Sequence, residues 1–365
     1  YRIDFCAIVK NSPESVAVLG DRFQVRVRSW RFELVDLLFE LHHQIEAIDV
    51  GLARVVLDGS ANSGFSTELF ANDEGRVLGL ALVRPDGSKE EIGCQALILA
   101  CNGYGGNPAM VADHIPEMVR AEYFGHPGNQ GDAVNWGEAL GAAAKHMTAY
   151  QGHGSVATPH GILITWAVMM NGGIQVNKLG QRFSNEHRGY SEQAVDVLAQ
   201  PDQVAWAILD DRLLTLGHEF EEFNLAEAAG AVRHAKDVED LSKIIDVPMA
   251  ALQKTLAETT AHAKGETTDT FGRDFTTQPA LSPPYYAIRV TGALFHTQGG
   301  LNIDPQARVL RPDGSALPNL YAGGGAACGL SGSQVWGYLS GNGLLTAVNL
   351  GRIAGQTATK FIKEG

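Results

Sequence analysis

The C-terminal run, residues 284–355, constrains the fold of this chain most strongly. An apolar segment, PYYAIRVTGALFHTQGGLNID, is followed by a Pro-Asp-Gly turn, by LPNLYAGGG and by GYLSGNGLLTAVNLGRIAG. This order predicts a strand, a turn and a second strand, and then a glycine-rich turn that opens a helix. Backbone N–H groups at such a place have no partner within the helix, so they can bind an anion or a polar ring. The run therefore predicts a place for a flat, polyanionic ligand.

Patterns upstream predict further strands and helices. Strands are expected at residues 52–57, 76–84 and 90–100, helices at 32–45 and 133–144, and a hairpin at 172–183. The segment 96–100 is apolar on both faces, which is typical of a buried parallel strand. Asp132 is expected to cap the helix that follows it. Residues 193–264 are rich in helix formers.

Composition limits the class of protein. A chain of 365 residues is long enough for two domains, and a net charge of −13 without a Lys/Arg cluster argues against nucleic-acid binding. Its cysteines, Cys6, Cys94, Cys101 and Cys328, lack the spacing of a metal site, so we expect no metal and reduced thiols in a cytoplasmic protein. No apolar run approaches the roughly 18 residues that span a bilayer, so we expect no transmembrane segment.

Four sequence blocks follow the order of a known family. They are ALILACNGYGGN (residues 96–107), GDAVNWGEALGA (131–142), GGIQVNKLGQRFSNE (172–186) and the C-terminal run. In these blocks the chain resembles flavoproteins related to fumarate reductase, succinate dehydrogenase flavoprotein subunits and 3-ketosteroid dehydrogenases. The resemblance implies an α/β fold, with a Rossmann-like FAD-binding domain and an inserted α+β capping domain. It places the FAD-binding domain at residues 1–148 and 296–365, and the capping or substrate domain at residues 149–295.

One element of the family is not found in the sequence. The family opens with a strand, a G-x-G-x-x-G turn and a helix that bind the FAD pyrophosphate. No such motif lies between Tyr1 and Arg31. We expect that the sequence lacks its natural N-terminus or that its first residues are a remnant, and residues 1–30 receive no role.

The glycine-rich loop after residue 100 follows a buried strand, where open α/β sheets bind their ligands. The resemblance implies that this loop, the loop after the second C-terminal strand and the start of the last helix hold FAD. A helix N-terminus there favours the negative charge of the reduced flavin. In many relatives position 325 is a glutamate that meets the cofactor, and here it is Gly325. The implied cofactor-binding residues are Cys101, Asn102, Gly103, Gly105, Asp132, Gly323, Gly324, Gly325, Asn342, Gly343, Leu344 and Leu345.

The resemblance also points to candidate catalytic residues. His153 and His296 stand at the two junctions of the capping domain, where fumarate reductases hold a substrate carboxylate. Two arginines of those enzymes correspond here to Tyr190 and Tyr338. A dicarboxylate needs charged, preferably bidentate donors. A phenol instead offers one neutral O–H, which can polarise a ketone, or accept a proton if its pKa is lowered.

Tyrosines at both positions are what 3-ketosteroid dehydrogenases have. The spacing Tyr338-Leu339-Ser340-Gly341 resembles their Δ4-dehydrogenating branch, in which a tyrosine and a serine form a proton relay and a glycine meets the substrate carbonyl. The pair Thr165-Trp166 replaces a Thr-Glu pair that fumarate reductases place on the substrate, so the cleft is expected to be more apolar. Two alternatives stay open: the tyrosines could serve packing alone, and Arg188 could replace the lost arginine.

The sequence therefore predicts an FAD-dependent oxidoreductase that adds or removes two hydrogens across a C–C bond next to a carbonyl. In this hypothesis a tyrosine moves the α proton while flavin N5 exchanges a hydride at the β carbon. The first choice of small-molecule substrate is a 3-ketosteroid or a similar cyclic ketone, with an electron acceptor that the sequence does not name. The alternatives are a fumarate-type dicarboxylate enzyme using His153, His296 and Arg188, and a flavin-free binding module.

Overall fold

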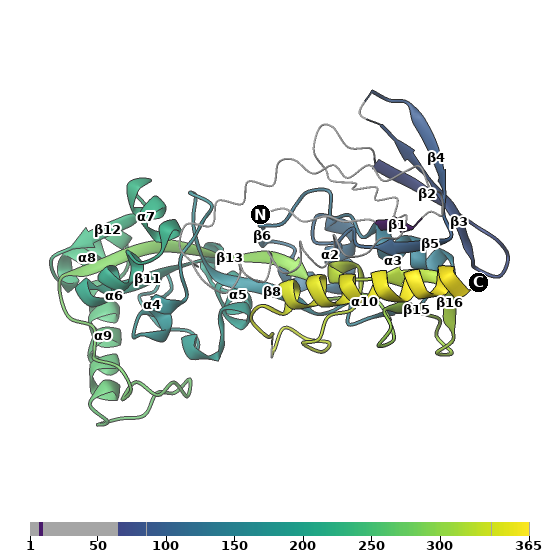
Figure 1. Cartoon of the computed structure of the whole chain (residues 1–365). Coiled ribbons are helices and arrows are strands. Elements are labelled where there is room, and N and C mark those ends of the chain that lie inside the picture. Colours follow the sequence, from purple (N-terminus) through teal and green to yellow (C-terminus); the bar gives the residue numbers. More distant parts are fainter. Residues whose placement is uncertain (1–6, 10–64, 85, 337, 365) are drawn as a thin grey trace.

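The structure, a computed structural model, describes residues 7–9, 65–84, 86–336 and 338–364. The described chain forms two lobes, and the long strand β13 (Tyr285–Thr297) runs from one toward the other (Figure 1). This arrangement confirms the predicted α/β fold with a capping lobe. The predicted helix at residues 32–45 and the strand at 52–57 lie outside the described residues.

The first lobe is built on a pair of parallel strands, β5 and β16. They form the middle of a sheet with the order β1 (Ala7–Val9), β5 (Ala96–Leu99), β16 (Ala316–Ala322) and β15 (Arg308–Leu310). Every residue of β5 is buried, as predicted for a strand that is apolar on both faces. The expected Pro-Asp-Gly hairpin joins β15 to β16, with Arg311 N–H donating to Ser315 O at 2.8 Å.

The last helix, α10 (Asn342–Glu364), begins where the sequence predicts and packs on this sheet. Its Ala354 and Ala358 are buried against Ile98 and Tyr321. Small side chains at this spacing let the helix approach the strands closely, because residues four apart lie on one helix face. In the part of the chain that the structure describes, no helix is both long enough and apolar enough to cross a bilayer.

A separate antiparallel sheet of β2 (Phe65–Ala71), β3 (Val77–Val83) and β4 (Lys89–Gly93) lies beside the first. The single strand expected at residues 90–100 was therefore wrong: the chain breaks between β4 and β5. Asn319 on β16 stabilises the break. Its buried side chain accepts from Val77 N–H at 2.9 Å and donates to the carbonyl oxygens of Val77 and Gln95 at 2.8 Å.

Shorter elements complete the first lobe. They are α2 (Pro108–His114), η1 (Pro116–Met118), α3 (Asp132–Ala139), β7 (Ala144–Lys145), β14 (Gly300–Leu301) and η4 (Gly324–Ala326). The helix expected at residues 133–144 is shorter than predicted, since Gly141 (φ +81°) ends it and β7 follows. The predicted N-cap was also wrong. Gly131 takes that position, and Asp132 lies in the first helical turn.

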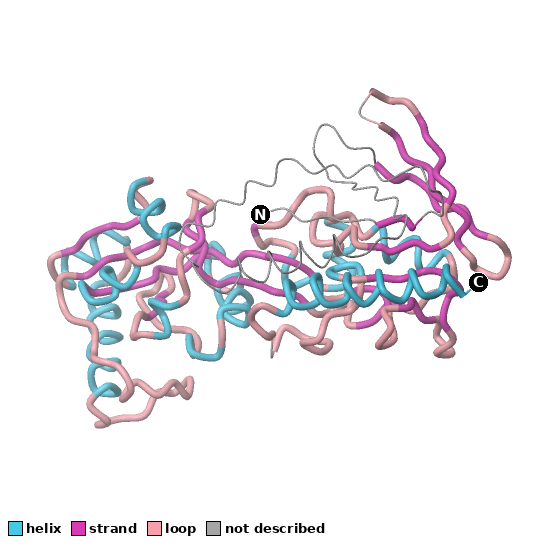
Figure 2. The backbone as a smooth tube through the Cα atoms, in the orientation of Figure 1, coloured by secondary structure: helices cyan, strands magenta, loops and turns pink. Residues whose placement is uncertain are grey.

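The second lobe contains a mixed sheet around β13 (Figure 2). Its strands are β6 (Glu122–Tyr123), β8 (Tyr150–Ala157), β9 (Ile162–Leu163), β10 (Ile174–Val176), β11 (Val204–Asp210), β12 (Val232–Ala235) and β13. The helices around it are α4 (Ala167–Met170), η2 (Glu186–Arg188), α5 (Tyr190–Leu198), η3 (Pro201–Gln203), α6 (Asp211–Gly217), α7 (Glu221–Ala228), α8 (Val238–Ile245) and α9 (Met249–Ala263).

Two expectations fail in this lobe. The helix-rich stretch 193–264 also contains β11 and β12, and β11 is buried along its whole length, so its sequence lacks the alternation that marks a half-exposed strand. The hairpin expected at residues 172–183 is wrong, because β10 pairs with β11 rather than with the residues after it. A turn closed by Gly180 N–H on Asn177 O follows β10 instead.

A buried ion cluster fixes the turn that leads into α5. The Glu186 carboxylate lies 2.7 Å from Arg182 and 3.1 Å from Arg273, and Arg182 also pairs with Asp269 at 2.7 Å. Burial raises the pKa of Glu186, but the two guanidinium groups outweigh burial and hold the pKa at about 2. Since Gln175 N–H also donates to Glu186 at 3.0 Å, the cluster ties the turn to β10.

Glu186→Gln should destabilise the fold by roughly 3–5 kcal/mol, because it leaves a buried guanidinium charge uncompensated. Urea unfolding of the two proteins at neutral pH measures the difference. The control is Glu239→Gln, which removes an exposed partner of Lys243 and should cost less than about 1 kcal/mol. Equal effects of the two substitutions would contradict a structural role for the cluster.

Candidate functional site

Two loops meet at the carboxyl ends of the parallel strands β5 and β16. The first carries Asn102 and Gly103, and the second carries Gly323, whose N–H donates to Leu99 O at 3.0 Å. Asn102 has a φ of +64°, a left-handed conformation that asparagine tolerates better than most residues. Loops at this edge of an α/β sheet are where ligands bind.

Glycine is required where these loops approach their neighbours. A Cβ atom on Gly325 would lie 2.1 Å from Asn102 Oδ1, and one on Gly103 would lie 2.1 Å from Thr297 Oγ1. The Asn102 side chain thus occupies the space that a side chain at position 325 would need. The loops present backbone groups rather than side chains, as close approach to a cofactor requires.

The start of α10 adds a buried polar group to the same region. Asn342 is 2% exposed, and its Nδ2 donates to Gln298 Oε1 at 2.5 Å and to Ser331 Oγ at 2.8 Å. Its Oδ1 has no hydrogen-bond partner among the described residues. A Cβ on Gly343 would lie 2.9 Å from His296 Nε2, so this helix start lies directly against the histidine. Glycine loops, first-turn N–H groups and an unpartnered acceptor fit the polar edge of a flavin.

The other residues predicted to bind the cofactor lie around these loops. Cys101 packs against the core of the first lobe, and a Cβ on Gly105 would lie 2.5 Å from the Tyr123 ring. Asp132 is partly buried in the first turn of α3, and burial raises the pKa of its carboxyl. Gly324 begins η4 with a φ of +57°. Leu344 and Leu345 are both exposed.

Aromatic and histidine side chains from both lobes form one cluster. His153 on β8 stacks on Tyr190 at the start of α5, with ring centroids 4.9 Å apart, and meets the edge of Trp166 at 5.7 Å. Tyr338 lies 6.0 Å from the Tyr190 ring and 6.1 Å from the His296 ring. The structure therefore brings together the five aromatic and histidine residues that the sequence singled out. We call them the aromatic cluster.

Ser340 joins the aromatic cluster through a hydrogen bond. Its Oγ lies 2.8 Å from Tyr190 Oη. The sequence predicted a relay between Tyr338 and Ser340, and the hydroxyl partner that the structure provides is Tyr190. The neighbouring Gly341 has a φ of +80°, and its carbonyl accepts from Leu345 N–H at 2.9 Å. Tyr190 and the segment before α10 thus meet across the two lobes.

Sequence reasoning missed Phe295, which stacks on His153 at 5.4 Å. Neighbouring residues of a regular strand point to opposite faces. In β13, however, the pairing with β8 shifts between Leu294 and His296. This irregularity turns the strand locally, so Phe295 reaches His153 while His296 reaches Tyr338. A bulge of this kind leaves no clear signal in the sequence.

Burial keeps the histidines of the cluster uncharged. His153 is 5% exposed, burial lowers its pKa to about 3, and its Nδ1 accepts from Ser155 N–H at 3.2 Å. Burial also lowers the pKa of His296. Burial raises the pKa of Tyr338, so this phenol keeps its proton. The lowered tyrosine pKa that a proton-accepting role requires is therefore not found at Tyr338.

Two of the predicted site residues, Arg188 and Thr165, bond to residues near them in the chain rather than to the aromatic cluster. Arg188 is half-exposed and forms an ion pair with Asp196 on α5. Thr165 Oγ1 accepts from Ala167 N–H at 3.3 Å, at the start of α4. Trp166 beside it is buried, and its Nε1 has no hydrogen-bond partner among the described residues.

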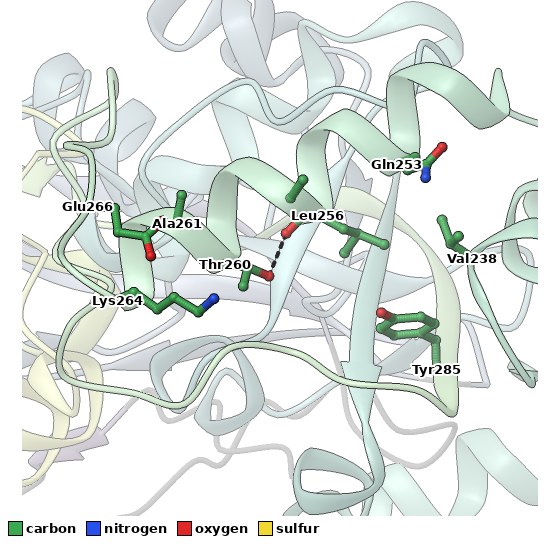
Figure 3. A pocket seen from close by; sticks show the side chains of 9 residues that line it. Val238, Gln253, Leu256, Thr260, Ala261, Lys264, Glu266 and Tyr285 are labelled. Atoms are coloured by element: carbon green, nitrogen blue, oxygen red, sulfur yellow. Dashed lines mark hydrogen bonds between the residues drawn. The ribbon is translucent and has the colours of Figure 1, made fainter.

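A shallow cavity elsewhere on the second lobe is distinct from this site. The cavity has a volume of about 330 Å³ and is lined by residues of α8, α9 and β13. Figure 3 shows several of these residues, among them Val238, Leu256, Lys264 and Tyr285. None of the residues predicted for cofactor or substrate lines it. We therefore place the candidate site at the aromatic cluster and the glycine loops.

The fold and the glycine loops define a flavoprotein with an α/β FAD-binding lobe. Residues 60–344 match the family described as FAD binding domain, and the chain belongs to this family. Its relatives include fumarate reductases and 3-ketosteroid dehydrogenases, so the superfamily predicted from the sequence, with FAD as cofactor, is confirmed.

Three comparisons illustrate the likeness. Fumarate reductase (cytochrome) of Shewanella frigidimarina is 30% identical over 298 residues, which are 81% of this chain and 51% of that protein. The open form of a flavocytochrome c3 fumarate reductase matches 90% of this chain and 55% of its own, with a TM-score of 0.68 and 28% identity. The 3-ketosteroid-Δ4-(5α)-dehydrogenase of Rhodococcus jostii matches 81% and 59%, with a TM-score of 0.61 and 25% identity. The chain spans about half the length of the curated relatives it matches.

Gly325→Ala should destabilise the protein by roughly 1–3 kcal/mol and weaken FAD binding, because the added methyl group displaces Asn102. Thermal unfolding and a fluorescence titration with FAD measure the two effects. Combining it with Asn102→Gly should recover most of the lost stability. Gly355→Ala is the control, since a Cβ there meets no atom within 4 Å. If Gly325→Ala behaves like this control, the close approach of the loops is not needed.

The lowered pKa of His153 should make stability depend on pH. Between about 3 and 6.5 the unfolded chain binds a proton at this residue that the folded chain does not. The free energy of unfolding should thus fall as pH drops below about 6.5, by up to about 1.4 kcal/mol per pH unit. His153→Phe keeps the ring and should reduce this slope in urea unfolding between pH 6.5 and 5. The exposed His160→Gln should leave the slope unchanged, and equal slopes in all three proteins would contradict the burial of an uncharged His153.

Proposed function

We propose that the protein is an FAD-dependent oxidoreductase that adds or removes two hydrogens across a C–C bond next to a carbonyl. Its proposed substrate is a 3-ketosteroid or another apolar cyclic ketone. The observation that carries this proposal is the hydrogen bond between Tyr190 and Ser340 within an aromatic cluster whose histidines are uncharged.

The charge of the cluster favours a ketone over a dicarboxylate. A dianion that leaves water needs cationic, hydrogen-bonding partners to offset its desolvation. His153 and His296 are held in the neutral form, and Arg188 is engaged by Asp196. Phe295 is stacked between Phe124 at 5.2 Å and His153 at 5.4 Å, and together with Trp166 it makes the surroundings of the cluster apolar. One matched structure is a 3-ketosteroid dehydrogenase with its steroid ligand.

The proposed cofactor site uses backbone groups at the carboxyl edge of the first sheet. Its residues are those predicted from the sequence: Cys101, Asn102, Gly103, Gly105, Asp132, Gly323, Gly324, Gly325, Asn342, Gly343, Leu344 and Leu345. A bound FAD would supply the exchange of a hydride at the β carbon of the substrate. The N-terminal turn of α10 would face the flavin edge that becomes negative on reduction.

The protein side chains would handle the carbonyl and the proton. Tyr338 keeps its proton and would donate a hydrogen bond to the carbonyl oxygen, which makes the α carbon more acidic. Tyr190 and Ser340 would pass a proton to the α carbon in reduction and accept one in dehydrogenation. The proton and the hydride together account for the two hydrogens. His296 would hold the ring of Tyr338, and His153 that of Tyr190.

The second candidate is a fumarate-type reductase or dehydrogenase. It is favoured by the first relatives in the comparison, which are fumarate reductases, and it would use His153, His296 and Arg188. The third alternative, a flavin-free binding module, is not favoured, because residues 60–344 match the family described as FAD binding domain. We also propose the division into residues 1–148, 149–295 and 296–365, and a cytoplasmic location suggested by the free thiols of Cys94 and Cys328.

Tyr338→Phe should lower turnover of the ketone by a factor on the order of 10² to 10⁴, because the ring stays and only the hydroxyl is lost. FAD binding should be unchanged. Steady-state rates with a panel of 3-ketosteroids, followed by bleaching of the flavin, measure the effect. Tyr286→Phe is the control: it removes an exposed phenol that hydrogen-bonds to Asp211 at 2.7 Å, and should keep full activity.

Fumarate and related dicarboxylates belong in the same panel. Three results together would replace the ketone proposal by the fumarate-type function. Only a dicarboxylate would bleach the flavin, Arg188→Gln would abolish that activity, and Tyr338→Phe would turn the dicarboxylate over at a nearly normal rate. Tyr190→Phe should behave like Tyr338→Phe if the two phenols divide carbonyl polarisation and proton transfer.

A further inference from the structure

We propose that Gln298 is a positioning residue that links His296 to the start of α10 and so fixes the segment carrying Tyr338 and Ser340. Gln298 is absent from the residues that sequence reasoning singled out. The inference rests on the proposed function for its effect on turnover, and on the structure alone for its effect on the segment.

Gln298 is held on every side. It directly follows β13 and is 4% exposed. Its N–H donates to Ala149 O, and its carbonyl accepts from Gly329 N–H, both at 2.7 Å. A Cβ on Gly329 would lie 2.2 Å from Gln298 Oε1, so the loop leaves room for this side chain only because residue 329 is glycine. The carboxamide therefore has a single fixed position.

The two ends of the carboxamide have different partners. Its Oε1 accepts from Asn342 Nδ2 at 2.5 Å, and its Nε2 lies 3.1 Å from both ring nitrogens of His296. We assign the ring proton of His296 to Nδ1, which lies 3.2 Å from Thr297 O, and this assignment leaves Nε2 as the acceptor for Gln298. An amide is the group that both accepts from Asn342 and donates to a neutral imidazole.

The contacts continue from Asn342 to the segment before α10. Ser331 Oγ accepts from Asn342 Nδ2 at 2.8 Å and from Leu339 N–H at 3.1 Å. Leu339 lies between Tyr338 and Ser340 in the chain, so this bond fixes the backbone that carries both hydroxyls. His296 contacts the Tyr338 ring at the other end of the network. Gln298 is the residue that joins these two supports of Tyr338.

Two substitutions test the hydrogen bonds at the two ends of the Gln298 carboxamide. Gln298→Met keeps the approximate length and removes both hydrogen bonds. Gln298→Glu keeps an acceptor for Asn342 and replaces the donor to His296 by a carboxylate. The control is Gln200→Met, which removes a partly buried amide that bonds to Asn177 and to Asp196 O, away from the aromatic cluster.

Two measurements need no substrate. In an NMR titration of the imidazole nitrogens, Gln298→Glu should raise the pKa of His296 by at least about one unit, because a carboxylate stabilises the imidazolium. Among the described residues, the groups that face this ring are Tyr338, Gln298, the Thr297 carbonyl and the first turn of α10 at Gly343, so the added negative charge comes from residue 298. In Gln298→Met, hydrogen exchange at the Leu339 amide should become at least about tenfold faster.

Turnover supplies the third measurement. Both Gln298 variants should lower kcat by roughly 10- to 100-fold and leave KM within about twofold, because a misplaced donor acts on the transition state more than on binding. Gln200→Met should leave kcat, the His296 pKa and the Leu339 exchange rate unchanged.

The outcomes separate the two proposals. If the His296 pKa and the Leu339 exchange rate respond as expected but no ketone is turned over, the positioning role stands and the proposed function fails. If the Gln298 variants keep the original pKa and exchange rate, or if Gln200→Met reproduces their changes, the positioning role is wrong.

Discussion

The backbone hydrogen bonds of β13 hold the two lobes and the candidate site together. The first half of this strand pairs with β11 and β12 in the second lobe, and its end pairs with β8 and β6. Its last residues, His296 and Thr297, and the following Gln298 lie at the edge of the first lobe. Because a paired strand cannot slip without reversing the faces of its side chains, the pairing with β8 also sets where His153 stands relative to His296.

The charged residues around the turn before α5 are paired with one another, and none of them belongs to the aromatic cluster. The buried carboxylate of Glu186 is balanced by Arg182 and Arg273, two residues that fix the turn before α5. Arg188, the arginine nearest to Tyr190 in the chain, turns outward to Asp196. The shifted pKa values of His153, His296 and Tyr338 favour the uncharged form of each side chain. Such an arrangement suits a reaction in which charge develops on the substrate only transiently.

Local features of the fold could be predicted from the sequence, and tertiary ones could not. The parallel strand β5, the Pro-Asp-Gly hairpin and the start of α10 were found because each has its own composition and turn signal. The strand β11 was missed because burial on both faces removes its periodicity. The contact of Phe295 with His153 depends on a bulge in β13. The hydrogen bonds of Gln298 to Asn342 and of Ser340 to Tyr190 join segments that are distant in the chain. A single sequence holds no pattern for either feature.

The net charge of the chain affects how fast a charged or an uncharged substrate would reach the site. The chain as a whole carries a net charge of −13, which repels dianions at long range and is screened by salt. An uncharged ketone is indifferent to this field, so its association rate would be governed by diffusion and desolvation and would hardly change with ionic strength. For a dicarboxylate, the same surface would make capture slow in dilute buffer and faster as salt is added.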